Sequence, residues 1–206
     1  MPYSFRGQRV DFQPTALAVS HSVSRVPVTV ENAPHSYRCG LGGGGGDVTY
    51  FLTFSTYGVH LPGDERGSTD RHLGRLPDGV PALEDFATGI MNESPFRLAE
   101  PDDREAVLET IVALCVRREW RLMALHVRTT HLHGLVQAEG ELPARVMGDW
   151  KANSSRVLKT RCPERQRFWA RGGDYRTVRE SLDAVIEYIL YGQGEPMATY
   201  VASPQR

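Results

Sequence analysis

Long apolar runs are scarce in this chain of 206 residues. The longest unbroken one, Ile111–Val116, has six residues, whereas a membrane-spanning helix needs about twenty. The first 22 residues are interrupted by Arg6, Arg9 and Asp11, so they lack the apolar core of a secretion signal. These absences exclude a polytopic membrane protein. We expect the protein to stay in the cytoplasm and to have no membrane partner.

Cysteine is also rare, with only Cys39, Cys115 and Cys162 at long and irregular spacings. An odd number of cysteines at such spacings argues against a disulfide framework, and no CxxC pair suggests a zinc site. We therefore expect three reduced thiols.

Neither sign of charge dominates, because 24 lysines and arginines face 25 aspartates and glutamates. The distribution along the chain is uneven. Residues 62–110 contain twelve acidic and five basic residues, and residues 145–179 contain ten basic and three acidic ones. A basic block of this kind could bind phosphates or could simply be a solvated helix face, and charge alone leaves both interpretations open.

The length fits one domain of roughly 150 residues with extra segments. Residues 1–46 show no sustained periodicity and end in the glycine run Gly42–Gly46. We expect them to form a poorly ordered N-terminal extension with a glycine-rich linker. The sequence predicts one domain over residues 47–197 and a tail over residues 198–206.

Seven segments carry secondary-structure patterns, and they are expected at 48–56 (strand), 102–120 (helix), 121–128 and 130–138 (strands), 143–159 (helix), 168–178 (short strand or hairpin) and 181–191 (helix). Asp102 and Glu105 have the spacing of a capping box at the start of the first helix. A long acidic loop separates the first strand from that helix. The order predicts an α+β fold with a ferredoxin-like (split βαβ) antiparallel sheet and an additional C-terminal helix.

Two histidines, His131 and His133, alternate with Leu132 in the predicted strand 130–138. Alternate side chains of a strand share a face, and their Cα atoms lie roughly 6.5 Å apart. Two imidazoles at that spacing could hold one divalent ion, although such a pair can also be incidental. His126 on the preceding strand could join them or could be only a hydrogen-bonded core group.

Tyr188 lies between Ile186 and Ile189 in the predicted last helix. A tyrosine in this setting is usually a core or rim aromatic. It can also be a covalent nucleophile, but its phenol titrates near 10 and needs a nearby metal or base.

Three motifs occur in order along the chain: residues 121–133 (RLMALHVRTTHLH), Phe168–Trp169 followed by 172–176 (GGDYR), and 187–190 (EYIL) followed by 192–196 (GQGEP). Together they resemble the single-tyrosine HUH transposases. More narrowly, the chain is similar to the REP-associated or insertion-sequence-like tyrosine transposases of bacteria. The resemblance covers about residues 48–197.

The resemblance implies an enzyme that cleaves and rejoins single-stranded DNA, with hairpin-containing element ends as its partner. It implies that His131 and His133 hold Mg²⁺ or Mn²⁺ at the scissile phosphate. Tyr188 would then form a 5′-phosphotyrosine and leave a free 3′-hydroxyl, so that resealing needs no nucleotide cofactor. Family members are monomers or homodimers that exchange the last helix, and residues 181–193 favour neither.

One position departs from the family pattern. Relatives often place a third polar metal ligand about one turn after the tyrosine, where this chain has Gly192. Gln193 follows it and Glu187 precedes the tyrosine, so the third ligand stays open, with Gln193 as the candidate. Tyr191 is an alternative nucleophile, although the match of residues 187–190 favours Tyr188.

The basic block suits a DNA backbone. The candidate DNA-binding residues are the cations Lys151, Arg156, Lys159, Arg167 and Arg176 and, for base stacking, Trp169 and Tyr175.

Two other functions compete with this one. A domesticated, non-catalytic protein on the same fold could bind single-stranded DNA or an RNA hairpin by stacking and charge. A zinc hydrolase could use His126, His131 and His133, but the chain has no carboxylate base at the spacing of HExxH.

Overall fold

The computed structural model describes residues 48–65, 69–70, 74–75, 79–179 and 181–203. The elements in chain order are β1 (Thr49–Ser55), β2 (Thr69–Asp70), β3 (Gly74–Arg75), α1 (Pro81–Gly89), α2 (Pro101–Arg117), β4 (Arg121–Val127), β5 (His131–Gln137), α3 (Pro143–Arg161), β6 (Asp174–Val178), α4 (Leu182–Tyr191) and β7 (Ala198–Val201). The predicted extension over residues 1–46 lies outside the described residues. Among the helices described, none has the length and apolarity to cross a membrane.

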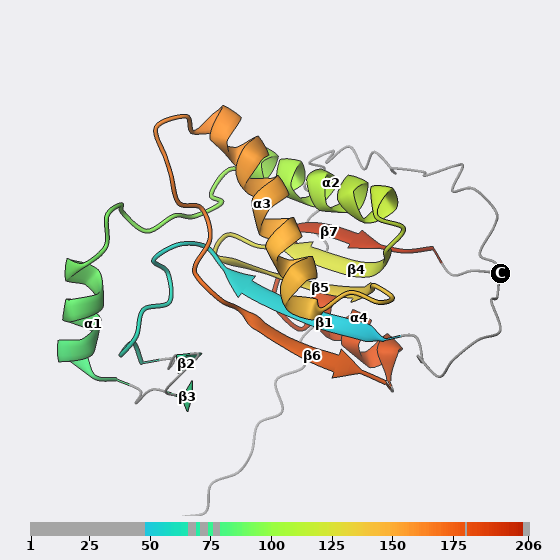
Figure 1. The fold of residues 1–206 in the computed structure, drawn as a ribbon, viewed down its shortest axis with the longest axis horizontal. Coiled ribbons are helices and arrows are strands. Elements are labelled where there is room, and N and C mark those ends of the chain that lie inside the picture. Colours follow the sequence, from blue (N-terminus) through green and yellow to red (C-terminus); the bar gives the residue numbers. More distant parts are fainter. Residues whose placement is uncertain (1–47, 66–68, 71–73, 76–78, 180, 204–206) are drawn as a thin grey trace, which may run out of the picture. The chain divides into compact units, whose positions relative to one another are not determined.

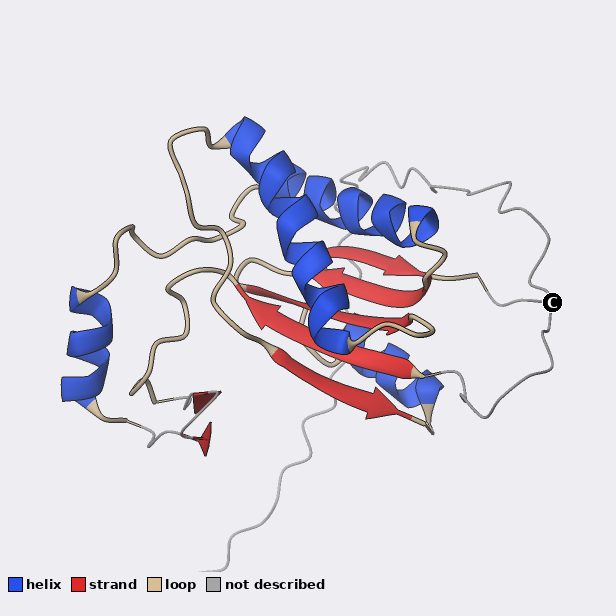
Figure 2. Cartoon of the chain, in the orientation of Figure 1, coloured by secondary structure: helices blue, strands red, loops and turns tan. Residues whose placement is uncertain are grey.

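The main sheet has five strands in the order β6-β1-β5-β4-β7, and every neighbouring pair is antiparallel. β5 lies between β1 and β4, which is the strand order of a split βαβ unit. The predicted ferredoxin-like α+β sheet is therefore confirmed. Helices α2 and α3 cover one face of the sheet, and α4, the additional helix, lies on the opposite face (Figures 1 and 2).

Each face of the sheet has its own apolar cluster. On β5, Leu132 and Val136 belong to the cluster under α2 and α3, whereas Leu135 belongs to the cluster under α4. Gly134 faces α3, and a Cβ at this position would lie 2.6 Å from the ring of Trp150. The glycine therefore allows the buried indole of α3 to pack directly on the strand.

The structure differs from the sequence prediction at three places. Residues 198–201, expected in a tail, form β7 and pair with β4 along the edge of the sheet. The predicted acidic loop contains α1 and the two-residue strands β2 and β3. The capping box is absent, because α2 begins at Pro101 with Glu100 as its N-cap, which places Asp102 within the first turn.

Candidate active site

The histidine pair lies on the α4 face of β5. The rings of His131 and His133 are 4.9 Å apart between centroids, so the predicted common face is confirmed. Nδ1 of His133 lies 2.8 Å from Oγ1 of Thr53 on β1, and Nδ1 of His131 lies 3.0 Å from Oγ1 of Thr130. These hydroxyls hold the δ nitrogens, so the ε nitrogens are the ring atoms that can meet a further group, which for His133 is the side chain of Gln193.

Both imidazoles are held neutral at neutral pH. Burial lowers the pKa of His133 to about 4, with the neighbouring His131 as the next cause. Burial also lowers the pKa of His131, and the positive charge of Arg128 adds to this effect. A metal-binding imidazole must be neutral, and these environments maintain that form without a metal.

The side chain of Gln193 lies beside the two histidines. Its Oε1 lies 3.2 Å from Nε2 of His133 and can accept a hydrogen bond from that ring. Hydrogen bonding to Gln193 raises the pKa of both His131 and His133, against the larger effect of burial. The segment after α4 thus brings an amide oxygen to the histidine pair. Glu187, the other side chain considered for this role, is exposed.

Tyr188 projects from α4 over the histidine face of the sheet. Its ring centroid lies 6.0 Å from that of His133 and 6.2 Å from that of Phe51, and 48% of the residue remains exposed. Phe51 stacks on His133 at 5.6 Å. Tyr191 is 67% exposed, and it makes no ring contact within the described part of the chain. Of the two candidate nucleophiles, Tyr188 is the one beside the histidines.

Gly192 has a steric role next to this tyrosine. It is the C-cap of α4, with φ near −71°, and a Cβ there would lie 2.6 Å from Cδ2 of Tyr188. The tyrosine ring therefore fills the space that a side chain at 192 would occupy.

His126 lies on β4 directly opposite His133 and on the same face, but its ring nitrogens are both engaged by backbone. Nδ1 is 2.7 Å from the carbonyl oxygen of Ile189, and Nε2 accepts from the N–H of Met197 at 3.1 Å. His126 has no nitrogen left for a metal. The described residues contain no group of three histidine, cysteine, aspartate or glutamate side chains that could hold a metal ion.

Thr53 and Arg128 belong to this site and were missed by the sequence analysis. Thr53 meets His133 only because β1 pairs with β5 in this register, which no local pattern reveals. Arg128 follows β4, and its Nη1 donates to the carbonyl oxygen of Glu195 at 3.2 Å. The sequence signal that could have indicated Arg128 is its position two residues after His126.

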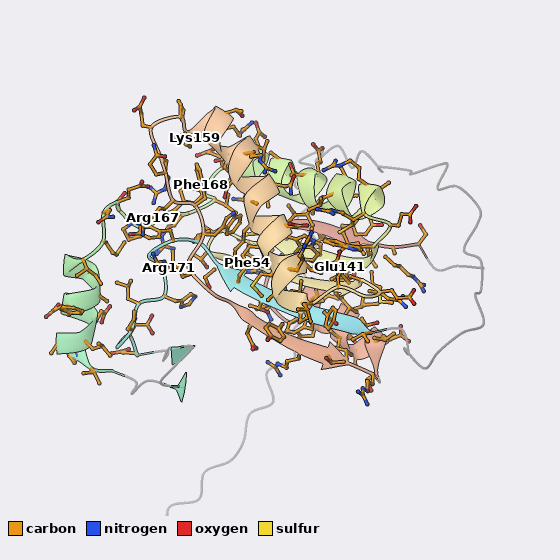
Figure 3. All side chains as sticks on the ribbon, viewed as in Figure 1. Phe54, Glu141, Lys159, Arg167, Phe168 and Arg171 are labelled. Carbon is orange, nitrogen blue, oxygen red and sulfur yellow. The ribbon has the colours of Figure 1, made fainter. Side chains whose placement is uncertain are left out.

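The predicted DNA-binding lysines of α3 are engaged within the protein. Lys151 donates to the carbonyl oxygens of Ala170, at 2.8 Å, and of Gly172, and burial lowers its pKa to about 8. Lys159 donates to the carbonyl of Arg165 at 2.8 Å. Both lysines fasten the segment between α3 and β6, on which Figure 3 shows Arg167 and Phe168.

The remaining predicted DNA contacts divide between the two faces. Arg156 and Arg167 are exposed, and Tyr175 is 50% exposed. Arg176 lies on the histidine face, with Cζ 5.9 Å from the ring centroid of Phe51. Trp169 is 8% exposed and packs edge-on against Phe54, so the structure leaves Tyr175, and not Trp169, available for stacking.

Comparison with known proteins gave one family match and several similar solved structures. Residues 95–191 match the family described as "Transposase IS200 like". A solved structure of a REP-associated tyrosine transposase bound to a REP hairpin has a TM-score of 0.39 and 10% identity, covering 71% of this chain and 66% of that one. The chain thus spans just under two thirds of that protein's length. A "putative transposase" from Deinococcus radiodurans R1 has a TM-score of 0.39 and 18% identity, covering 74% and 95%. No curated protein matches.

Proposed function

We propose that this chain, of which residues 95–191 match the IS200-like transposase family, cleaves and rejoins single-stranded DNA through a covalent bond to Tyr188. The observation that carries the proposal is the meeting of Tyr188 and His133 within one chain, with 6.0 Å between their rings. An exposed phenol beside two neutral imidazoles and an amide oxygen suits attack on a phosphodiester.

The donor set fits Mg²⁺ or Mn²⁺. His131, His133 and Gln193 would hold the ion: the amide oxygen is a ligand that suits both ions, and the two imidazole nitrogens favour the transition metal Mn²⁺ over Mg²⁺. Nε2 of His133 lies 3.2 Å from Oε1 of Gln193, so these two donor atoms are already close together at one place. When bound, the ion would stabilise the negative charge that develops on the phosphoryl oxygens.

The residues of the chain divide the remaining work. Oη of Tyr188 would lose its proton and form a bond to phosphorus, and the bond from phosphorus to the 3′ oxygen would break. The released 3′ oxygen takes up a proton, which leaves a 3′-hydroxyl and a 5′-phosphotyrosine. Attack by a 3′-hydroxyl on this intermediate reverses the bond changes, so no nucleotide is consumed. Thr53 orients the imidazole of His133, and the cations Arg128 and Arg176 would attract the DNA backbone.

The substrate that we propose is the hairpin-containing ends of a mobile element. We propose that the protein acts on them in the cytoplasm. The exposed side chains of Arg156, Arg167 and Tyr175 would contact the DNA away from the site of cleavage. A non-catalytic hairpin-binding protein is the alternative outcome of the test below.

The test uses single-stranded oligonucleotides that cover the hairpins flanking the gene, with Mn²⁺ or with EDTA. We expect a protein–DNA adduct on a denaturing gel that requires Mn²⁺, is lost in Tyr188→Phe and survives in the matched control Tyr191→Phe. Loss in Tyr191→Phe alone would move the nucleophile to that residue. Binding without an adduct across several hairpins would support the non-catalytic protein.

The contact between Tyr188 and His133 of the same chain also supports a site built within one protomer. Mixing the inactive variants Tyr188→Phe and His133→Asn tests this directly. A site within one chain restores no adduct, whereas exchange of α4 between two protomers would pair an intact tyrosine with an intact histidine and restore it.

A further inference from the structure

His126 is fully buried, and its two hydrogen bonds determine its tautomer. A carbonyl oxygen only accepts, so Nδ1, 2.7 Å from the oxygen of Ile189, carries the proton. A backbone N–H only donates, so Nε2, 3.1 Å from the nitrogen of Met197, carries none. The ring is therefore neutral and protonated at Nδ1.

These two bonds hold the segment that carries the other site residues. Ile189 follows Tyr188, and its carbonyl lies in the last turn of α4, where the helix supplies no N–H partner. Met197 lies four residues after Gln193 and directly precedes β7. The imidazole of His126 thus joins both ends of residues 189–197, and it does so from the strand that pairs with the histidine strand.

We propose that His126 is a positioning residue. Its Nδ1 fixes the position of the end of α4, and with it Tyr188, and its Nε2 fixes the position of the loop that carries Gln193. This inference rests on the proposed function, because it assigns the groups that His126 places to a transposase site. His126 itself touches neither substrate nor metal. Arg128 supports the same loop through its bond to the carbonyl of Glu195.

Two conservative variants separate the two bonds. The side-chain amide of asparagine reaches the position of Nδ1, so His126→Asn keeps the donor to Ile189 and loses the acceptor for Met197. The longer glutamine reaches the position of Nε2, so His126→Gln keeps the acceptor and loses the donor. Val127→Ala is the matched control, because Val127 is buried on the same strand but faces the opposite side of the sheet.

The measurements are Mn²⁺ affinity, from water proton relaxation, and the single-turnover rate of adduct formation at saturating Mn²⁺. We expect His126→Asn to bind Mn²⁺ about tenfold more weakly and to form the adduct at nearly the wild-type rate at saturating Mn²⁺. We expect His126→Gln to bind Mn²⁺ with nearly the wild-type affinity and to form the adduct about tenfold more slowly. Val127→Ala should change neither. Equal losses in both histidine variants, or values like those of the control, would overturn the proposal.

A second measurement uses the unmodified protein and remains informative if a variant fails to fold. The ¹⁵N spectrum of His126 should show a neutral ring protonated at Nδ1, and the amide of Met197 should exchange slowly with solvent. An Nε2–H or a charged ring would refute the assignment. If the wild type forms no adduct, the proposed function fails, whereas the Mn²⁺ affinities and the ¹⁵N spectrum still decide on His126.

Discussion

Lowering the pH from 7 to 5 should destabilise the folded protein through its buried site histidine. The pKa of His133 is lowered by burial, and then by His131, to about 4, whereas an unfolded histidine titrates near 6.5. Between these values the unfolded chain binds a proton that the folded chain does not, so the free energy of unfolding falls as the pH falls.

The size of this effect follows from the two pKa values. A pH of 5 lies about 1.5 units below the pKa of an unfolded histidine, and each unit corresponds to about 1.36 kcal/mol. His133 alone therefore lowers the free energy of unfolding by about 2 kcal/mol between pH 7 and pH 5. His126 and His131 also have lowered pKa values and add to the loss. A comparison of variants therefore has to isolate His133.

Urea unfolding at pH 7 and pH 5 measures the effect, with fluorescence of the buried Trp120, Trp150 and Trp169 as the probe. His133→Asn is the comparison, because asparagine can still bond to Thr53 and does not titrate. Wild type should lose about 2 kcal/mol more than the variant between the two pH values. At pH 7, Mn²⁺ should stabilise wild type and not the variant. Equal pH dependence would show that His133 is not held neutral by its surroundings.

Two further pairs of variants test the packing of the nucleophile and the basic helix. Gly192→Ala should slow adduct formation about tenfold or more, because its Cβ would lie 2.6 Å from Cδ2 of Tyr188. The control is Gly148→Ala, where a Cβ meets nothing within 4 Å. Equal rates of adduct formation in the two variants would refute the steric role of Gly192. Lys151→Met should lower the free energy of unfolding by about 1–2 kcal/mol, while Arg156→Gln should leave it within about 0.5 kcal/mol and weaken single-stranded DNA binding in a salt-dependent way. Urea unfolding measures the stabilities, and DNA titration at several salt concentrations measures the binding. A larger loss of stability in Arg156→Gln than in Lys151→Met would contradict this prediction.

Local periodicity explains how much of the fold was predictable. The alternation around Leu132 identified the strand and the common face of its two histidines, because the period of a strand is independent of its partners. β7 was missed because four residues, with only Ala198 buried, carry too little pattern to signal a strand. Its pairing with the edge of β4 comes from tertiary structure.

The candidate site shows the same limit. The positions of Tyr188 and Gln193 beside His133 agree with the interpretation from sequence, and their roles stay predictions. Thr53 was not predictable, because its contact depends on the register between β1 and β5 across 80 residues. His126 lies on the predicted face, but only the structure shows that both of its nitrogens are occupied.

Mapping the covalent bond between protein and DNA would identify the nucleophile directly. The adduct formed with Mn²⁺ and a hairpin oligonucleotide would be digested with nuclease and protease, and the peptides sequenced by mass spectrometry. We expect a nucleotide 5′-phosphate on Tyr188 in the peptide that contains residues 182–191. A nucleotide on Tyr191 or on another residue, or a cleaved oligonucleotide without any covalent peptide, would contradict it.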